Sequence, residues 1–549
     1  MCKNGCMHKT WGAMRRLYSL RLPSYILATW HVHDRQIKPF VSWFLQTKTY
    51  HVVKSTVQPT DRAAQRLMQV VLLALYVTGM MLIWGSFAYN LAGMWAFGLA
   101  IIIAVPLLLM TFFVVAIATV RIFGYLLRPK RFGKAIVAYI LEQQVVRLRL
   151  KHRFTVVAVA GSVGKTSTKL AVAELLGQHL RVQYQAGNYN DRVTVPLVFF
   201  GQNQPSLLNP FAWMRTFGAI AASLHHPYPY DVVVVELGTD GPGQMREFAY
   251  ARPDLTILTA ISPEHMAFFG TLDAVAVEES SVFDYSHRVL VNTDLVAPKY
   301  LVGKDYIGYS QQRKTSRNYY SESSRFNLGG QFLQIHTPSG IISAHTKFVG
   351  MQGASSVLAA TAVADLLGLK RAAISDAIES LTPFAGRMQV MDGIKGSKLI
   401  DDTYNASPIA VKAALDVLYG TKTKQRIAVL GSMNELGEFS KEAHIEVGAY
   451  CDSKRLDYVL TIGRDAQRWL APAARDVGCS VRTFTSQAAC AAFIRKHIKE
   501  GAVILAKGSQ NGVFAEEVVK QLLAHPSDAR KLVRQSPSWL KVKAKQFSD

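Results

Sequence analysis

The chain has 549 residues, half of them hydrophobic, and its 62 Lys and Arg against 38 Asp and Glu give a formal net charge of +24. This length excludes a peptide, a disulfide-stapled mini-protein and a single small domain, and at roughly 100–200 residues per domain it predicts about three units. The apolar content excludes a mainly disordered chain. The five cysteines are sparse and odd in number, which argues against a disulfide framework and favours a reducing compartment.

The positive charge is concentrated around one uncharged segment. Residues 67–120 contain no Asp, Glu, Lys or Arg, whereas residues 1–66 carry a net charge of +9 and residues 121–153 a net charge of +8. Basic flanks around an apolar block that is long enough for two spans of about 20 residues are typical of a membrane protein. We therefore predict two transmembrane helices, at about 67–88 and 91–120. The alternative, a buried helical hairpin of a soluble protein, would expose a charged face.

Expectations about location and partners follow from the charge. Because both flanks are basic, we expect a hairpin in the bacterial cytoplasmic membrane, with the N-terminus and the remaining domains in the cytoplasm. The membrane is then one expected partner. Because +17 of the +24 lies beside the apolar segment and not on the rest of the chain, we expect no nucleic-acid partner.

After the apolar block, residues 132–150 predict a helix, and from residue 154 onward apolar runs that predict buried strands alternate with helical stretches. Strands this apolar suit a parallel sheet that helices cover on both faces, so the predicted fold class is α/β. The expected central strands are 154–160, 231–238 and 255–262, the expected helices are 166–180 and 350–369, and 285–350 is expected to be β-rich. The expected later strands are 398–404, 426–432, 457–463, 480–486 and 502–509.

This pattern divides the chain into four parts. We place a basic N-terminal region with the transmembrane hairpin at 1–150, a central P-loop domain with a mostly parallel sheet at 151–384, a Rossmann-like C-terminal domain at 385–530 and a basic tail at 531–549. Residues 201–230 form an aromatic and basic insertion, which we expect to be a surface loop, with membrane contact as the alternative.

The segment Gly161–Thr168 (GSVGKTST) predicts a phosphate-binding loop, because it follows a buried strand and opens a helix. Its glycines let backbone N–H groups turn toward phosphate oxygens, and the helix N-terminus adds positive potential. Val159 stands where the longer P-loop pattern has its first glycine, so this is a shorter variant. The predicted ATP-binding residues are Gly161, Ser162, Gly164, Lys165, Thr166 and Ser167, with Thr166 also as a Mg²⁺ ligand.

Two further polar residues follow buried strands. Glu236 ends the strand at 231–238, where a carboxylate beside a P-loop can hold Mg²⁺ directly or through water. His265 comes just after the strand at 255–262, in the segment Ser262-Pro263-Glu264-His265. A surface glutamate and a structural histidine are the alternative interpretations.

Seven short motifs, in this order, resemble those of the Mur ligase family. They are GSVGKTST at 161–168, GNYN at 187–190, ELG at 236–238, PEH at 263–265, AGR at 385–387, DDTYNASP at 401–408 and KGS at 507–509. Within the family, the last motifs and VLGSMNELGEFS at 429–440 are most similar to the branch that adds D-alanyl-D-alanine to a UDP-muramoyl tripeptide. The resemblance spans about residues 154–525.

The resemblance implies an ATP-dependent ligase that joins a carboxylate to an amine through an acyl phosphate, with ATP and Mg²⁺ as cofactors. It implies that Lys165 contacts the β- and γ-phosphates, that Thr166 and Glu236 hold one Mg²⁺, and that His265 helps to hold a second. Arg387 resembles the family's phosphate-contacting arginine. By the same resemblance, Asp402 and Asn405 face the nucleotide, Lys507 and Ser509 lie near the incoming amine, and Asn188 and Asn190 face the muramoyl peptide.

The sequence also departs from the family pattern. By spacing, Glu279 occupies the position of a lysine that several members carbamoylate, and we hypothesise that it supplies a carboxylate directly; an ordinary helix glutamate is the alternative. The segment Gly350–Ser356 lacks the asparagines that usually help to bind adenine. The soluble N-terminal domain that grips the UDP-sugar is replaced by the predicted hairpin.

The predicted function is an ATP-dependent amide ligase that adds D-alanyl-D-alanine to a muramoyl-peptide cell-wall precursor at the membrane. Its expected substrates are a muramoyl peptide or similar acid and an amino acid or dipeptide. A poly-γ-glutamate synthase-like ligase is one alternative, and a membrane P-loop NTPase acting as a transporter or sensor is another. A degenerate ligase that only binds partners is a further alternative. The apolar segment offers no intramembrane charge for an ion path, which counts against the transporter.

Overall fold

The computed structural model describes residue 81 and residues 129–547, apart from short gaps at 207–208, 313–317, 324–325, 435 and 511. The chain divides into two compact units, Met1–Ile136 and Val137–Asp549. Except for Met81, the predicted spans at 67–88 and 91–120 lie outside the described residues. The account below concerns the second unit, together with the helix that leads into it.

The described helices do not support the predicted membrane location. None of them is both long enough and apolar enough to cross a membrane. The longest, α7 (Pro129–Lys151), has 23 residues, but Lys and Arg side chains occur along it from Lys130 to Lys151. One face of α7 packs Leu141 and Val145 into the core of the larger sheet, with no exposed surface. The predicted location in the bacterial cytoplasmic membrane is therefore wrong as far as the described residues go, and the two predicted spans themselves lie outside those residues.

The larger sheet has nine strands in the order β2-β3-β1-β4-β5-β6-β7-β8-β9. Neighbours from β2 to β7 pair in parallel, and β8 and β9 complete the sheet in antiparallel fashion. In chain order the strands are β1 (Thr155–Ala160), β2 (Val182–Gln183), β3 (Val232–Glu236), β4 (Leu255–Leu258), β5 (Arg288–Asn292), β6 (Ile307–Ser310), β7 (Tyr319–Ser323), β8 (Gln331–Thr337) and β9 (Gly340–Thr346).

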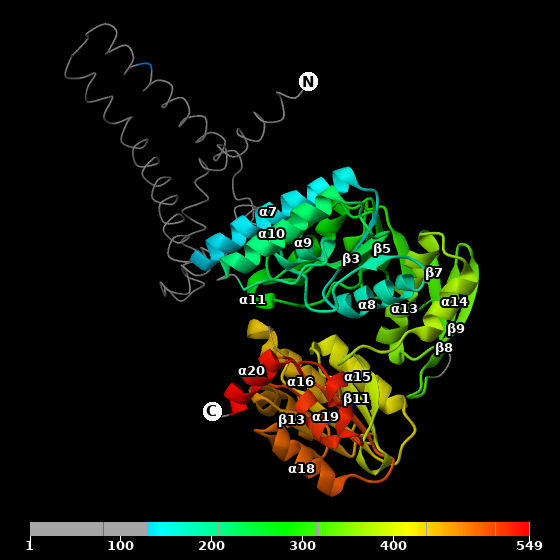
Figure 1. Cartoon of the computed structure of the whole chain (residues 1–549). Helices are drawn as coiled ribbons and strands as arrows, with labels where there is room; N and C mark the ends of the chain where they lie inside the picture. The colour runs from blue at the N-terminus through cyan, green and yellow to red at the C-terminus, as the bar shows by residue number, and fades with distance from the viewer. Residues whose placement is uncertain are drawn as a thin grey trace, which may run out of the picture. The chain divides into compact units, whose positions relative to one another are not determined.

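Helices cover both faces of this sheet, as the apolar strands predict. Successive residues of β1 point to opposite faces, so that Val156 and Ala158 pack in one core while Val157 and Val159 pack in the other. Figure 1 shows α7 and α10 together over one face and α8 and α13 on the other. The helices are α8 (Lys165–Gly177), α9 (Thr194–Phe199), α10 (Pro210–His225), α11 (Met266–Phe269), α12 (Leu272–Glu279), α13 (Gly350–Leu366) and α14 (Arg371–Ser380).

The insertion at 201–230 is not a surface loop, because α10 occupies most of it. Asn209 caps α10 by accepting a hydrogen bond from the Ala212 N–H, and Pro210 starts the helix with a fixed φ. The Trp213 side chain is buried in the core that also contains α7. Burying an aromatic side chain of this size contributes a few kcal/mol, which holds α10 on the sheet.

The smaller sheet has six strands in the order β10-β11-β15-β12-β13-β14, all parallel except β10. The five strands predicted at 398–404, 426–432, 457–463, 480–486 and 502–509 are all present, each shorter by one to three residues. The strands are β10 (Gln389–Asp392), β11 (Lys398–Asp402), β12 (Arg426–Gly431), β13 (Tyr458–Ile462), β14 (Val481–Phe484) and β15 (Val503–Lys507).

Helices also cover both faces of the smaller sheet, with α15, α16 and α17 packing in one core and α18 and α19 in the other. The helices are α15 (Pro408–Gly420), α16 (Ser440–Tyr450), α17 (Ala471–Asp476), α18 (Gln487–His497), α19 (Glu516–Leu522) and α20 (Pro537–Phe547). The predicted α/β class with mostly parallel sheets is confirmed.

Candidate active site

A glycine turn joins β1 to α8. Gly161 has φ +119°, and a Cβ atom there would lie 2.5 Å from Thr259 Oγ1 and 2.8 Å from Ala260 N, so no other residue fits. Gly164, at φ +87°, precedes the first residue of α8. The Ser162 hydroxyl accepts a hydrogen bond from the Ser262 N–H at 3.0 Å, which ties the turn to the loop after β4. The loop therefore has the backbone geometry of a phosphate cradle.

A cavity of about 450 Å³ lies at this turn, with residues after β1, β3, β4, β11 and β15 on its wall. Such a position, outside the carboxyl ends of parallel strands, is where open α/β sheets bind ligands. Thirteen of the predicted site residues line it: Ser162, Gly164, Lys165, Thr166, Ser167, Asn188, Asn190, Glu236, His265, Arg387, Asp402, Asn405 and Lys507. Gly161, Glu279 and Ser509 do not. Gln352, Gly353 and Ser356, from the segment that lacks the family asparagines, line it as well.

Glu236 lies at the centre of a buried polar cluster. The Thr166 hydroxyl donates to Glu236 Oε1 at 3.2 Å, and the Asn190 side-chain amide donates to the same oxygen at 3.4 Å. Glu236 Oε2 lies 3.2 Å from Lys169 Nζ, and both side chains are 2% exposed. Lys169 Nζ also donates to the Gly187 carbonyl at 3.0 Å. A hydroxyl and a carboxylate oxygen thus meet at the cavity wall, as a Mg²⁺ site requires.

Lys165 is held over the P-loop by acidic neighbours. Its Nζ donates to the carbonyl of Gly161 and lies 3.4 Å from Glu264 Oε2. Burial lowers the pKa of Lys165, but the nearby carboxylates of Glu264, Glu279 and Glu236 outweigh burial, so the pKa is raised. Lys165 therefore stays charged, as a phosphate contact must.

Glu279 lies behind the P-loop instead of on the cavity wall. Its side chain is fully buried, and Oε2 accepts a hydrogen bond from the Gly161 N–H at 2.8 Å. Burial raises the pKa of Glu279 well above its ordinary value, Lys165 opposes this effect, and Glu264 adds to it. The Gly161 N–H therefore donates its hydrogen bond to a side chain of the protein itself, Glu279. In this arrangement it does not point at a phosphate.

His265 directly precedes the short helix α11 and has a left-handed backbone, at φ +46°. Its Nε2 lies 3.7 Å from Asp240 Oδ1, and both residues line the cavity. Asn188 also lines the cavity, in the segment that precedes α9. The P-loop and the loops after β3 and β4 thus converge on one site, as their motif order suggests.

On the side of the smaller sheet, Lys507 and Asp402 form a buried ion pair at the ends of the neighbouring strands β15 and β11. Lys507 Nζ also donates to the Asn405 carbonyl at 3.1 Å. Ser509 is buried, and its hydroxyl accepts a hydrogen bond from the Asn434 N–H at 3.0 Å and donates one to the Ala406 carbonyl at 3.4 Å. Ser509 therefore braces the loops and does not face the cavity.

Arg387 is placed by stacking. Its guanidinium carbon lies 3.9 Å from the centre of the Tyr404 ring, a close cation–π contact. The Tyr404 N–H donates to the Gly386 carbonyl at 3.1 Å, and the Arg387 N–H donates to the Phe384 carbonyl at 3.0 Å. Arg387 and Tyr404 both line the cavity.

Several residues of the site were not predicted. Lys169 follows Lys165 by four residues, so both lie on one face of α8, and a lysine within the apolar stretch of that helix is the signal that marks it. Glu264 belongs to a recognised motif but had no predicted role. Tyr404 likewise lies inside the DDTYNASP motif, where only Asp402 and Asn405 were singled out.

The residues fit ATP with Mg²⁺. The glycine turn, the charged Lys165 and the helix N-terminus suit phosphate, and Thr166 with Glu236 suits a shared metal ion. Among the described residues, no group of three or more His, Cys, Asp or Glu side chains is arranged to hold a metal alone.

Fold and site together define a P-loop α/β nucleotide-binding protein with a second Rossmann-like sheet. Two family models match the chain, the Mur ligase middle domain over residues 159–364 and the Mur ligase glutamate ligase domain over residues 386–510. The chain belongs to the Mur ligase family and is an ATP-dependent ligase that forms amide bonds.

Individual relatives and structures agree with this assignment. The chain is 27% identical over 376 residues to the UDP-N-acetylmuramoyl-tripeptide--D-alanyl-D-alanine ligase of Escherichia coli, covering 67% of this chain and 76% of that protein. It is 27% identical over 409 residues to the enzyme of the same name from Bacillus subtilis, covering 70% and 79%. The crystal structure of MurF from Acinetobacter baumannii has a TM-score of 0.59 at 22% identity, covering 70% of this chain and 80% of its own. MurF of Thermotoga maritima, solved with ADP, has a TM-score of 0.57 at 22% identity, covering 70% and 82%.

Proposed function

We propose that the protein adds D-alanyl-D-alanine to a UDP-N-acetylmuramoyl tripeptide, with cleavage of ATP to ADP and phosphate. The enzymes of this name in Escherichia coli and Bacillus subtilis support the choice of substrates. The observation that carries the proposal is the shared cavity, in which the P-loop and Glu236 face Arg387 and the Asp402–Lys507 pair. A transporter or sensor, the alternative of another class, is not supported by either family match.

In the proposed reaction, this chain chiefly positions charged groups. Lys165 and the P-loop amides hold the β- and γ-phosphates while a substrate carboxylate oxygen attacks the γ-phosphorus; the bond from that phosphorus to the bridging oxygen breaks, ADP leaves, and an acyl phosphate forms. Arg387 faces the same space from the other side of the cavity and stabilises the charge that the transferred phosphoryl group carries. The amine of the dipeptide then attacks the acyl phosphate, and phosphate leaves.

Thr166 and Glu236 would hold one Mg²⁺, and His265 would contribute to a second. The metal ion, when bound, neutralises phosphate charge and polarises the phosphoryl group. Lys169 balances the charge of Glu236 from the side away from the P-loop hydroxyl. We assign Asn188 and Asn190 to the muramoyl-peptide side, Asp402 and Asn405 to the nucleotide side, and Lys507 to the incoming amine; Ser509 supports Lys507 through the loops that it braces.

We further propose that Glu279 directly supplies the carboxylate for which several members carbamoylate a lysine; burial raises its pKa, and the neighbouring charge of Lys165 opposes that rise. Its carboxylate lies within the electrostatic reach of Lys165 and hydrogen-bonds the first glycine of the P-loop. No CO₂ is needed to form this carboxylate. We also retain the division into a central domain at 151–384 and a C-terminal domain at 385–530, which the limits of the two matched family models support.

The experiment is ATP-dependent phosphate release by the purified full-length protein, measured against a panel of acceptors and amines. Release that requires both a UDP-muramoyl tripeptide and D-alanyl-D-alanine supports the proposal. Release that requires glutamate instead supports the poly-γ-glutamate synthase-like alternative and overturns the substrate assignment. Lys165→Ala should abolish release, whereas Lys299→Ala, which removes an exposed lysine paired with Asp273, should not change it.

A further inference from the structure

The segment after residue 530, predicted to be a basic tail, is a folded part of the C-terminal structure. Leu532 is buried in the core beside α19, and α20 follows at Pro537–Phe547. Two of the basic side chains are almost fully buried, Arg534 with 5% and Lys543 with 3% of the side chain exposed. Buried cations require anionic partners, and here the partners are two glutamates at the start of α19, Glu516 and Glu517.

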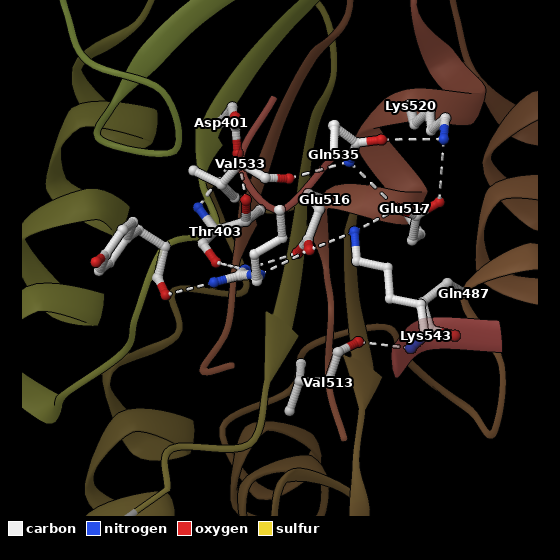
Figure 2. A network of polar contacts seen from close by, with 12 residues as sticks. Asp401, Thr403, Gln487, Val513, Glu516, Glu517, Lys520, Val533, Gln535 and Lys543 are labelled. Carbon is white, nitrogen blue, oxygen red and sulfur yellow. Dashed lines mark hydrogen bonds and ion pairs between the residues drawn. The ribbon is translucent and has the colours of Figure 1, made fainter. Parts of the chain in front are cut away.

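Both cations converge on Glu516, whose side chain has no exposed surface. Arg534 Nη2 lies 2.7 Å from Glu516 Oε2, and Lys543 Nζ lies 2.8 Å from Glu516 Oε1. Lys543 also pairs with Glu517 at 2.6 Å. Figure 2 shows Lys543 reaching toward Glu516 and Glu517 at the start of α19. Because desolvation offsets much of the attraction between such charges, the cluster fixes the position of the groups it joins more than it adds stability.

The guanidinium of Arg534 has a second set of partners, in the loop after β11. It donates to the Thr403 carbonyl at 2.5 Å and to the Tyr404 carbonyl at 3.0 Å. Only arginine presents enough donors in a fixed planar fork to serve a carboxylate and two carbonyls at once. Thr403 and Tyr404 directly follow Asp402, which lines the cavity. Arg534 therefore links the tail to the wall of the active site.

The tail also contacts the segment that carries Arg387. Val533 packs against Gly386, where a Cβ atom would lie 2.8 Å from Val533 Cγ1 and 3.0 Å from Tyr404 N. The Tyr404 N–H donates to the Gly386 carbonyl, and the Tyr404 ring stacks on the Arg387 guanidinium. Val533 and Arg534 thus contact both segments that carry the stacked pair, Gly386–Arg387 and Thr403–Tyr404.

We propose that residues 531–547 are a clamp for the active site, and that Arg534 is a positioning residue that holds Tyr404 and, through its ring, Arg387 toward the cavity. The effect on catalysis rests on the proposed function, in which Arg387 meets the transferred phosphoryl group. The structural half of the proposal, that Arg534 orders the loop at 402–405, does not depend on it.

The first test compares Arg534→Ala and Arg534→Lys with Arg426→Ala in the full-length protein. Arg426, the first residue of β12, is a matched control, because its guanidinium also donates to two main-chain carbonyls, those of Leu418 and Thr421. It does not line the cavity. We expect Arg534→Ala to lower kcat for phosphate release about 10- to 100-fold, as misplacement of a reacting group does. Arg534→Lys, which keeps the charge but not the fork, should lie between the wild type and Arg534→Ala. Arg426→Ala should lower kcat less than twofold at a temperature at which it remains folded. Equal losses for Arg534→Ala and Arg426→Ala would overturn the proposal.

The second test asks whether Arg534 acts through Arg387. If it does, Arg534→Ala should lower kcat in the wild type but cause less than a twofold further loss when Arg387 is already alanine. Independent, multiplicative losses would show that Arg534 acts elsewhere and would refute the positioning role.

A third measurement separates this inference from the proposed function. Amide hydrogen exchange of a peptide covering 400–408 should be at least about tenfold faster in Arg534→Lys than in the wild type, with no change in a peptide covering 426–431. If the wild type ligates no muramoyl acceptor, the proposed function fails while this result still stands. Unchanged exchange at 400–408 would refute the clamp even in an active enzyme.

Discussion

The buried pair of Lys169 and Glu236 allows metal binding to be separated from stability. Glu236→Gln keeps the shape of the side chain but removes its negative charge, so the buried Lys169 ammonium is left with neutral acceptors, such as the Gly187 carbonyl at 3.0 Å, and no carboxylate partner. Breaking a buried ion pair from one side costs about 3–5 kcal/mol, because the remaining charge is desolvated without compensation. For a compact unit of this size, with an unfolding entropy of about 2.1 cal/mol/K per residue, such a loss lowers the unfolding temperature by about 4–6 °C.

The double variant Lys169→Met, Glu236→Gln removes both charges at similar volume. We expect it to recover most of the lost stability, since no uncompensated charge remains in the interior. Its affinity for Mg²⁺ should not recover, because the carboxylate next to the Thr166 hydroxyl is still missing. A loss of about 10- to 100-fold in Mg²⁺ affinity is expected for both variants.

The assays are thermal unfolding of the purified protein and a Mg²⁺ titration of ATP-dependent phosphate release. Arg181→Gln serves as a control, since its ion pair with Asp231 is largely exposed and its loss should leave the unfolding temperature close to that of the wild type. If Glu236→Gln unfolds at the wild-type temperature, or if the double variant is less stable than the single one, Lys169 and Glu236 do not depend on each other as described. Full Mg²⁺ affinity in Glu236→Gln would remove Glu236 from the metal site.

Three further predictions concern the P-loop, Glu279 behind it, and Asp401 in strand β11 of the smaller sheet. Gly161→Ala should weaken the binding of an ATP analogue at least about tenfold, since its Cβ would overlap Thr259 Oγ1; wild-type affinity in a binding titration would contradict the geometry. Glu279→Gln should slow phosphate release about tenfold and alter its Mg²⁺ dependence. The wild type should release phosphate at the same rate in CO₂-free buffer. An unchanged rate in the variant, or a CO₂ requirement in the wild type, would contradict the role of Glu279. Burial raises the pKa of Asp401 from 3.8 to about 6, so the native state holds this proton more tightly and stability should fall by about 3 kcal/mol as the pH rises from about 4 to 6. Urea unfolding from pH 4 to 7 should show that Asp401→Asn removes this part of the slope, and an identical slope in the variant would refute the assignment.

The sequence predicted those parts of the fold that depend on local pattern. Apolar runs marked the strands of the smaller sheet, because parallel strands buried on both faces have little polar content, and glycine spacing marked the P-loop, because only glycine fits at Gly161. Two errors have one physical origin. The insertion at 201–230 and the tail at 531–549 carry residues typical of a surface, and composition does not reveal that Trp213 and Arg534 find buried partners far away in the chain.

The site shows the same division. Lys165, Thr166 and Glu236 were predicted because each stands at a strand end or helix start, where backbone geometry alone creates a function. Lys169 was missed because its importance lies in the identity of its partner, which follows it by 67 residues. Ser509 was assigned to the cavity because of its motif, whereas its hydroxyl faces the Asn434 N–H of a neighbouring loop.

The folded tail has a consequence for the order in which the protein is made. Arg534 and Lys543 leave the ribosome after Glu516 and after every strand of both sheets, so a nascent chain in which both sheets have formed still contains a buried acidic side chain without its cations. Domains generally fold as they emerge, with the N-terminal parts first. We therefore expect the loop at 402–405 to reach its final conformation late in synthesis. In the nascent chain, the P-loop would form before Arg534 can hold Tyr404 and Arg387 in place.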